Sequence, residues 1–149
     1  MNINEMKHSI SNAIATVAGR RHRLIIIAKP QGIEDKQIEE IGLLSVNINL
    51  CLSEKLIDLP INKRSRMVGA LVSELVRSYS GEQILAFSKF ELLFLPELQQ
   101  DPVRLFEELS KERTLVIFWP GNYQDGLLSY AEPWHREYYE NSDIDAIIL

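Results

Sequence analysis

The stretch 24–36 most constrains the fold of this 149-residue chain, because it joins a strand to a Gly/Pro turn and then to a helix. Residues 24–28 are apolar at every position, which is typical of a central strand in a parallel sheet. Pro30 and Gly32 mark the turn, and apolar residues at helical spacing follow over 33–41. A strand, a turn and a helix in this order form the frame of a phosphate-binding loop.

The chemistry of such a loop is largely missing from this stretch. In the working motif G-x-x-x-x-G-K-[ST], glycines let backbone N–H groups surround the phosphates, the Lys reaches the β/γ-phosphates and the hydroxyl holds Mg²⁺. With Ala28 at the first glycine position, Ile33 takes the second. Glu34 then stands at the Lys position and Asp35 at the Ser/Thr position. The frame therefore predicts nucleotide binding, whereas these two carboxylates argue against NTP hydrolysis.

If this loop holds a nucleotide, a small set of residues would contact the phosphates. They are Lys29, Pro30, Gln31, Gly32 and Lys36. The cofactor that fits the frame is ATP or ADP with Mg²⁺, although nothing in the sequence requires one. Backbone amides and the N-terminus of the following helix would add neutral donors, while Glu34 and Asp35 would repel phosphate. We expect replacement of both Lys29 and Lys36 by Ala to abolish any such affinity.

Composition and charge narrow the class of protein. A chain of 149 residues with 46% hydrophobic and 25% charged residues is typical of one globular domain, which we place over 1–149. The net charge of −5 gives no overall attraction to DNA or to an anionic membrane, so we expect DNA contact only through partners. No apolar run approaches the roughly 20 residues that cross a bilayer, and no signal peptide is visible. We therefore expect a cytoplasmic protein.

Helical and strand patterns alternate along the chain. We expect helices over 3–18, 33–41, 52–59, 61–79 and 101–111, and strands over 24–28, 46–50, 83–87, 114–119 and 146–149. The first helix is amphipathic and occupies an N-terminal segment of about 1–20. Residues 120–133 are expected to form a turn and a loop with a short extended piece. The alternation predicts an α/β fold with a three-layer, mostly parallel sheet of the P-loop NTPase type.

Ligands of such sheets bind beyond the carboxyl ends of the strands. At the end of the third strand, where a P-loop protein places its Mg²⁺-organising acid, this chain has Ser88. Glu91 is a candidate water-activating group, the alternative being a solvated carboxylate. Arg104 and Arg113 are candidate arginine fingers, the alternative being surface salt bridges with neighbouring glutamates. The histidines are scattered, so we assign no catalytic set and no metal ligands.

Aromatic residues concentrate in the last 31 positions. Trp119, Tyr130 and Trp134 lead this group, and Trp and Tyr are enriched at protein interfaces because they combine a large buried area with a polar group. We expect a partner surface at this end of the chain. The alternative is packing under the edge of the sheet.

Several runs of residues share their order and spacing with a known family: 93–105 (LFLPELQQDPVRL), 110–114 (SKERT), 119–121 (WPG), 125–126 (DG), 129–133 (SYAEP) and the apolar carboxyl-terminal strand. In these runs the chain resembles BrxF, the small P-loop protein of type 3 BREX bacteriophage-defence systems, and the resemblance covers most of the chain from Leu24 onward. It implies a nucleotide-binding α/β domain within an assembly that distinguishes host from phage DNA. The Gly-Lys-Thr of the family's loop is Ile33-Glu34-Asp35 here, and its Walker-B-type Asp is Ser88.

Three functions remain open from the sequence. The first is an accessory subunit of an anti-phage defence complex whose degenerate loop makes it a pseudo-ATPase or a weak nucleotide binder. The second is an active ATPase that uses Lys36 in an unusual register, with Glu91 activating water. The third is a scaffold or adaptor without a ligand. The expected partners are other subunits of the defence system or further copies of the chain.

Overall fold

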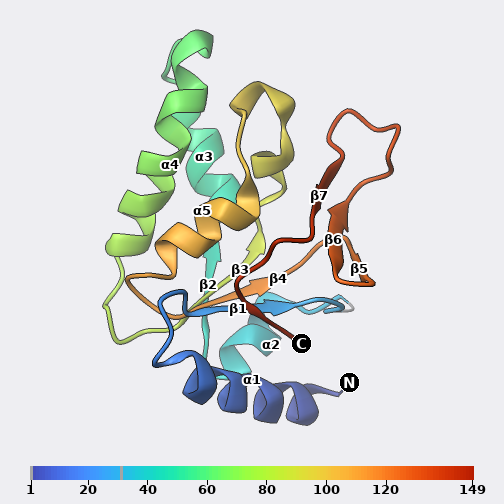
Figure 1. Ribbon diagram of the computed structural model, residues 1–149. Helices are drawn as coiled ribbons and strands as arrows, with labels where there is room; N and C mark the ends of the chain where they lie inside the picture. The colour runs from blue at the N-terminus through green and yellow to red at the C-terminus, as the bar shows by residue number, and fades with distance from the viewer. Residues whose placement is uncertain (1, 31) are drawn as a thin grey trace.

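The computed structural model describes residues 2–30 and 32–149 and shows three layers (Figure 1). The middle layer is a five-stranded sheet in the order β2-β3-β4-β1-β8, and its pairings are parallel. Its strands are β1 (Leu24–Ile27), β2 (Leu44–Asn47), β3 (Leu85–Lys89), β4 (Leu115–Phe118) and β8 (Ile147–Ile148). One face carries α1 (Ile3–Val17) and α2 (Asp35–Glu40); the other carries α3 (Ile48–Leu56), α4 (Ile61–Arg77) and α5 (Pro102–Leu109). The predicted three-layer α/β architecture is confirmed.

The apolar sequence of β1 follows from its central position. Leu24 and Ile26 pack into the core under α3, α4 and α5, whereas Ile25 and Ile27 pack into the core under α1 and α2. The strand pairs with β4 on one side and with the short edge strand β8 on the other. Every side chain of β1 is therefore buried, and the absence of polar alternation is explained.

Helix caps in the sequence set two of the predicted boundaries. Asn2 and Glu5 form a capping box at the start of α1, and the Asp101 side chain accepts from the backbone N–H of Arg104 with Pro102 as first residue of α5. Side-chain oxygens thus satisfy amides that lack a partner at the start of a helix. Both helices begin where the sequence predicts.

The predicted strand over 46–50 is wrong in its second half. The strand ends at Asn47, whose side chain accepts from the backbone N–H of Leu50 at 2.9 Å, so α3 begins at Ile48. Ile48, Leu52 and Leu56 recur every four residues and are buried on one face of that helix. The helix expected over 52–59 therefore starts earlier and ends earlier.

The third strand is displaced by two residues from its prediction, so Ser88 and Lys89 still belong to β3. Two short 3-10 helices follow, η1 (Glu91–Phe94) and η2 (Pro96–Leu98). Ile61 is the first residue of α4 and is 76% exposed, whereas Val68, Val72 and Val76 further along that helix are buried.

A small antiparallel sheet replaces the loop expected over 120–133. It contains β5 (Asn122–Gln124), β6 (Leu127–Tyr130) and β7 (Tyr139–Asn141). Asp125 and Gly126 join β5 to β6, and both have positive φ, as a type I′ hairpin turn requires. A Cβ at Gly121 would collide with the carbonyl oxygen of Ser129, so only glycine allows the approach of the chain to β6. Figure 1 shows this sheet standing beside the main sheet.

Candidate functional site

The carboxyl ends of β1 and β3 bring two of the expected site segments together. They enclose a hollow of about 420 Å³, which we call the loop hollow. Its lining residues are Ile33, Glu34, Asp35, Lys36, Ser88 and Lys89. The residues at the motif's second-glycine, Lys and hydroxyl positions thus lie beside the end of β3, where the sequence places the missing metal-binding acid.

Asp35 is the centre of the hydrogen bonding in the loop hollow. One carboxylate oxygen accepts from Lys89 Nζ at 2.9 Å, and the other accepts from Ser45 Oγ at 2.9 Å. These two bonds, that from Lys89 above all, lower the pKa of Asp35 below its ordinary value. A P-loop protein places a cation on the loop and an acid at the end of the third strand. This chain has the opposite arrangement, and the two charges form an ion pair with each other.

The start of α2 is also occupied by its own side chains. Glu34 and Gln37 form a capping box, in which the backbone N–H of Glu34 donates to Gln37 Oε1 at 2.9 Å. The amide of Glu34, at the position of the motif's Lys, is therefore engaged within the helix. A phosphate here would meet two carboxylates and would compete with existing bonds.

The remaining loop candidates are dispersed. Lys36 lines the loop hollow, whereas Lys29 and Pro30 do not. Gly32 has a φ of 69°, a conformation that favours glycine. Gln31 lies outside the described residues. The structure thus brings Lys36 to the loop hollow with one further cation, Lys89, that the sequence analysis did not select.

Glu91 lies at the start of η1 and is held by α3. Its carboxylate accepts from Asn49 Nδ2 at 2.6 Å, and Asn49 Oδ1 accepts from the backbone N–H of Leu92 at 3.0 Å. Asn49 therefore bonds to the first two residues of η1. Glu91 is not among the residues lining the loop hollow, so the geometry gives it a role in joining η1 to α3.

The two candidate arginine fingers differ in exposure. Arg104 forms ion pairs with Glu107 at 2.6 Å and with Asp143 at 2.9 Å, which is the salt-bridge alternative. Arg113 is only 5% exposed, and burial lowers its pKa. Its guanidinium donates to the backbone carbonyls of Val76, Tyr79, Ser80 and Gln83. Arg113 fixes the chain after α4 and cannot reach another subunit from this position, which corrects its assignment as a finger.

The aromatic candidates separate into packed and exposed residues. Trp119 is 1% exposed and donates its Nε1–H to the carbonyl of Ser129 at 3.0 Å. Tyr130 stacks on Phe94 with ring centroids 3.9 Å apart, so β6 packs against η1. Trp134 is 83% exposed. Packing therefore explains Trp119, which does not belong to a surface, and mostly explains Tyr130, while Trp134 alone of the three lies open.

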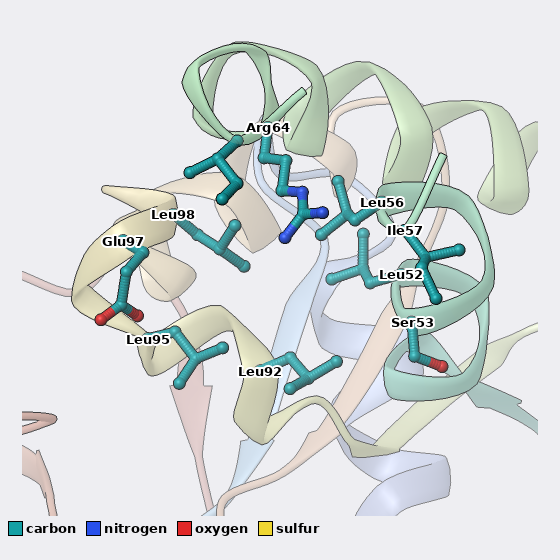
Figure 2. Close-up of a pocket in the computed structure, with 10 residues that line it drawn as sticks. Leu52, Ser53, Leu56, Ile57, Arg64, Leu92, Leu95, Glu97 and Leu98 are labelled. Carbon is teal, nitrogen blue, oxygen red and sulfur yellow. The ribbon is translucent and has the colours of Figure 1, made fainter. Parts of the chain in front are cut away.

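A second hollow was missed by the sequence analysis. It has a volume of about 460 Å³ and lies between α3, the start of α4 and the two 3-10 helices (Figure 2); we call it the α3/α4 groove. Its lining residues are Leu52, Ser53, Leu56, Ile57, Ile61, Arg64, Leu92, Leu95, Glu97 and Leu98. The sequence contains one indication of this groove. Ile61 follows Pro60 directly and so begins a new helix, where it need not be buried with the apolar residues of that helix's later turns.

Comparison of the chain with models of protein families, with curated proteins and with solved structures finds no match. Within residues 2–30 and 32–149, the structure brings no three His, Cys, Asp or Glu side chains into a group that could hold a metal ion. No helix in that part of the chain is long and apolar enough to cross a membrane. The fold and the site define an α/β protein with a parallel sheet, an internally neutralised loop hollow and an open apolar groove.

Proposed function

We propose that this chain is a P-loop-like subunit without ATPase activity that acts through contacts with other proteins. The observation that carries the proposal is the ion pair between Asp35 and Lys89, formed where a P-loop would hold Mg²⁺ and phosphate. The resemblance to BrxF adds the type of assembly, an anti-phage defence complex of the type 3 BREX class. The chain would be a pseudo-ATPase subunit of that complex.

Three features of the loop hollow and its surroundings support the absence of hydrolysis. Glu34 and Asp35 place negative charge where the substrate would bring more, and like charges repel. Ser88 provides no carboxylate for a metal ion. Glu91, which the ATPase alternative needs, is bonded to Asn49. An active enzyme would require Lys36 and Glu91 to rearrange together.

Thermal unfolding with and without millimolar ATP, ADP or GTP and Mg²⁺ tests the nucleotide part of the proposal. A ligand at about 100 times its Kd would add roughly 2.7 kcal/mol, which raises Tm by several degrees in a domain of this size. We expect no shift and no release of phosphate. A shift or phosphate release that disappears in Lys36→Ala, but not in Lys7→Ala on α1, would overturn the proposal.

Co-purification tests the partner part. A tagged chain expressed with the other subunits of a type 3 BREX system should retain at least one of them. The double variant Lys29→Ala/Lys36→Ala should retain the same subunit, because the contact does not depend on a nucleotide. Loss of the subunit in this variant, with the fold intact, would favour a nucleotide-dependent assembly instead.

A further inference from the structure

We infer that the α3/α4 groove binds an amphipathic helix of a partner protein. That helix packs its apolar stripe into the groove and places a carboxylate against the guanidinium of Arg64. The inference rests on the proposed function, since it names the surface and the partner chemistry through which the subunit would act. Helix-in-groove recognition uses apolar anchors at i, i+3, i+4 and i+7. The groove supplies both the apolar walls and the charge that such a helix needs.

The groove is apolar on three sides. Leu52 and Leu56 come from α3. Leu92 comes from η1, Leu98 comes from η2, and Leu95 lies between these two 3-10 helices. The floor at Leu52 is fully buried, whereas Ile57 and Ile61 on the rim are 73% and 76% exposed. Large aliphatic side chains exposed on the rim of one groove indicate a surface that another molecule covers.

Arg64 sets the charge of the groove. Figure 2 shows its guanidinium pointing from α4 into the space between Leu56 and Leu98. Its Nε donates to the carbonyl of Leu59 at 3.1 Å. Its two terminal nitrogens have no hydrogen-bond partner among residues 2–30 and 32–149. A partner that covers the groove must supply an acceptor, and a carboxylate matches the two parallel N–H groups of a guanidinium.

The surroundings of Arg64 strengthen this charge. Lys63 and Arg66 are its neighbours on α4, and the helix has no acidic residue before Glu74. Pro60 at the N-cap provides no side-chain acceptor, so the positive end of the helix dipole is not neutralised. These cations are unfavourably placed in the isolated subunit, and an acidic partner would compensate them.

The acidic residues near the groove do not neutralise Arg64. Glu97 lies on the opposite rim, where its carboxylate is paired with Arg136 and points away from Arg64 in Figure 2. Glu54 and Asp58, at the end of α3, are exposed and do not line the groove. The charge of the groove is therefore positive, and the complementary helix is acidic.

A different protein, rather than a second copy, is the expected occupant. Within the described chain, α1 and α5 bury their apolar faces against the sheet, as Ile10 and Phe106 illustrate. The apolar stripe of α4 is buried at Val72 and has basic residues at its open end. A second copy would thus offer no free apolar face on α1 or α5, and through the start of α4 it would bring like charge to Arg64.

Selection from a displayed library of 18-residue helical peptides tests the inference on the intact chain. The peptides carry randomised apolar, acidic, basic and polar residues, and selected peptides are then labelled with fluorescein for anisotropy. We expect the selected peptides to share apolar residues at i, i+3, i+4 and i+7 and at least one acidic residue. Selected peptides that are basic, or that lack the apolar stripe, would overturn the inference, as would the failure to select any.

Variants of the groove locate the binding. The exposed double variant Ile57→Glu/Ile61→Glu and the single variant Arg64→Gln should each weaken peptide binding at least tenfold. Leu50→Glu is the matched control, because Leu50 is exposed on α3, which forms one wall of the groove, but does not itself line the groove. Far-UV circular dichroism and Tm establish that each variant folds. Equal binding by all three variants would overturn the inference.

A double-mutant cycle tests the charge pairing. Replacing the peptide's acidic residue by Gln should weaken binding to the natural chain and leave binding to Arg64→Gln unchanged.

Sedimentation of the chain alone should show no dimer that Ile57→Glu/Ile61→Glu disrupts. Such a dimer would assign the groove to a second copy. If the groove variants still co-purify with a defence subunit, the groove assignment fails while the proposed function stands.

Discussion

The loop hollow and the α3/α4 groove have similar volumes, about 420 and 460 Å³, but their charged groups are satisfied in different ways. In the loop hollow, Asp35 accepts from Lys89 and Ser45, and Glu34 is part of a capping box. In the groove, the terminal nitrogens of Arg64 have no acceptor within the part of the chain that the structure describes. A ligand must break existing bonds in the first hollow, whereas it can add a missing bond in the second.

This difference shows why the position of a hollow is a weak guide to its use. The loop hollow lies at the carboxyl edge of the parallel sheet, where ligands of α/β proteins bind. In this hollow, however, Asp35 and Lys89 already neutralise each other, so neither charge needs a bound ligand or metal ion. The walls of the groove come from α3 and η1, which directly follow the carboxyl ends of β2 and β3. Its apolar wall and the terminal nitrogens of Arg64, which have no acceptor among residues 2–30 and 32–149, make it the better candidate for binding.

The largest effect should come from the floor of the groove. Leu52 is fully buried, so we expect Leu52→Ala to lower the free energy of unfolding by about 2–5 kcal/mol. Ile57→Ser and Ile61→Ser on the exposed rim should each change it by less than about 0.5 kcal/mol. Urea unfolding measures all three. If Leu52→Ala and the two rim variants lowered the free energy of unfolding equally, the rim would be buried in solution. The groove would then be closed and could not be the open binding site that distinguishes it from the loop hollow.

Restoring the phosphate loop tests whether the loop hollow differs from a working site only in its side chains. The substitutions Ala28→Gly, Ile33→Gly, Glu34→Lys and Asp35→Thr recreate G-x-x-x-x-G-K-T in the observed frame. We expect the variant to gain about 2.7 kcal/mol of stability with ATP and Mg²⁺ at roughly 100 times its Kd. The thermal shift measures this gain.

The natural chain and a variant with Ala28→Gly and Ile33→Gly alone serve as controls for the restored loop. Neither should shift with ATP, because both retain Glu34 and Asp35. The absence of a shift in the fully restored variant, if it folds, would indicate that the resemblance of the frame to a P-loop is superficial.

The ion pair itself should have a smaller and pH-dependent effect. The pKa of Asp35 is lowered in the folded protein, so the pair stabilises it above the unfolded pKa of about 3.9, and this stability is lost as pH falls through the folded pKa. Both side chains are about half exposed, so Asp35→Asn should cost only about 0.2–1 kcal/mol at pH 7. Urea unfolding of natural chain and variant from pH 7 to pH 2 measures the difference. A difference that does not narrow below pH 4 would contradict the ion-pair assignment.

The sequence predicts most of the main sheet because the controlling interactions are local. The apolar run of β1 and the caps of α1 and α5 are visible in short stretches. The end of β2 was predicted wrongly because alternation and helical spacing overlap at Asn47, and the side chain's hydrogen bond to Leu50 decides between them. The small antiparallel sheet was missed although Asp125-Gly126 is a hairpin signal, because its strands have only three or four residues.

The candidate sites depend on contacts that a linear pattern does not contain. The pairing of Asp35 with Lys89 joins residues 54 positions apart, and the burial of Arg113 depends on carbonyls 30 to 37 positions away. The groove combines four separate helical segments, α3, α4, η1 and η2. The sequence could therefore indicate that the loop had lost its chemistry, but not that Lys89 neutralises it.

The smallest effect is expected at Trp134, which belongs to neither of the two hydrophobic core clusters. Because its side chain is 83% exposed, Trp134→Ala should change the free energy of unfolding by less than about 0.5 kcal/mol. It should also leave peptide binding by the α3/α4 groove unchanged, since Trp134 does not line it. Urea unfolding and anisotropy measure the two quantities. If Trp134→Ala instead weakens retention of a defence subunit while peptide binding persists, then the partner covers two surfaces, and the groove supplies only one part of the contact.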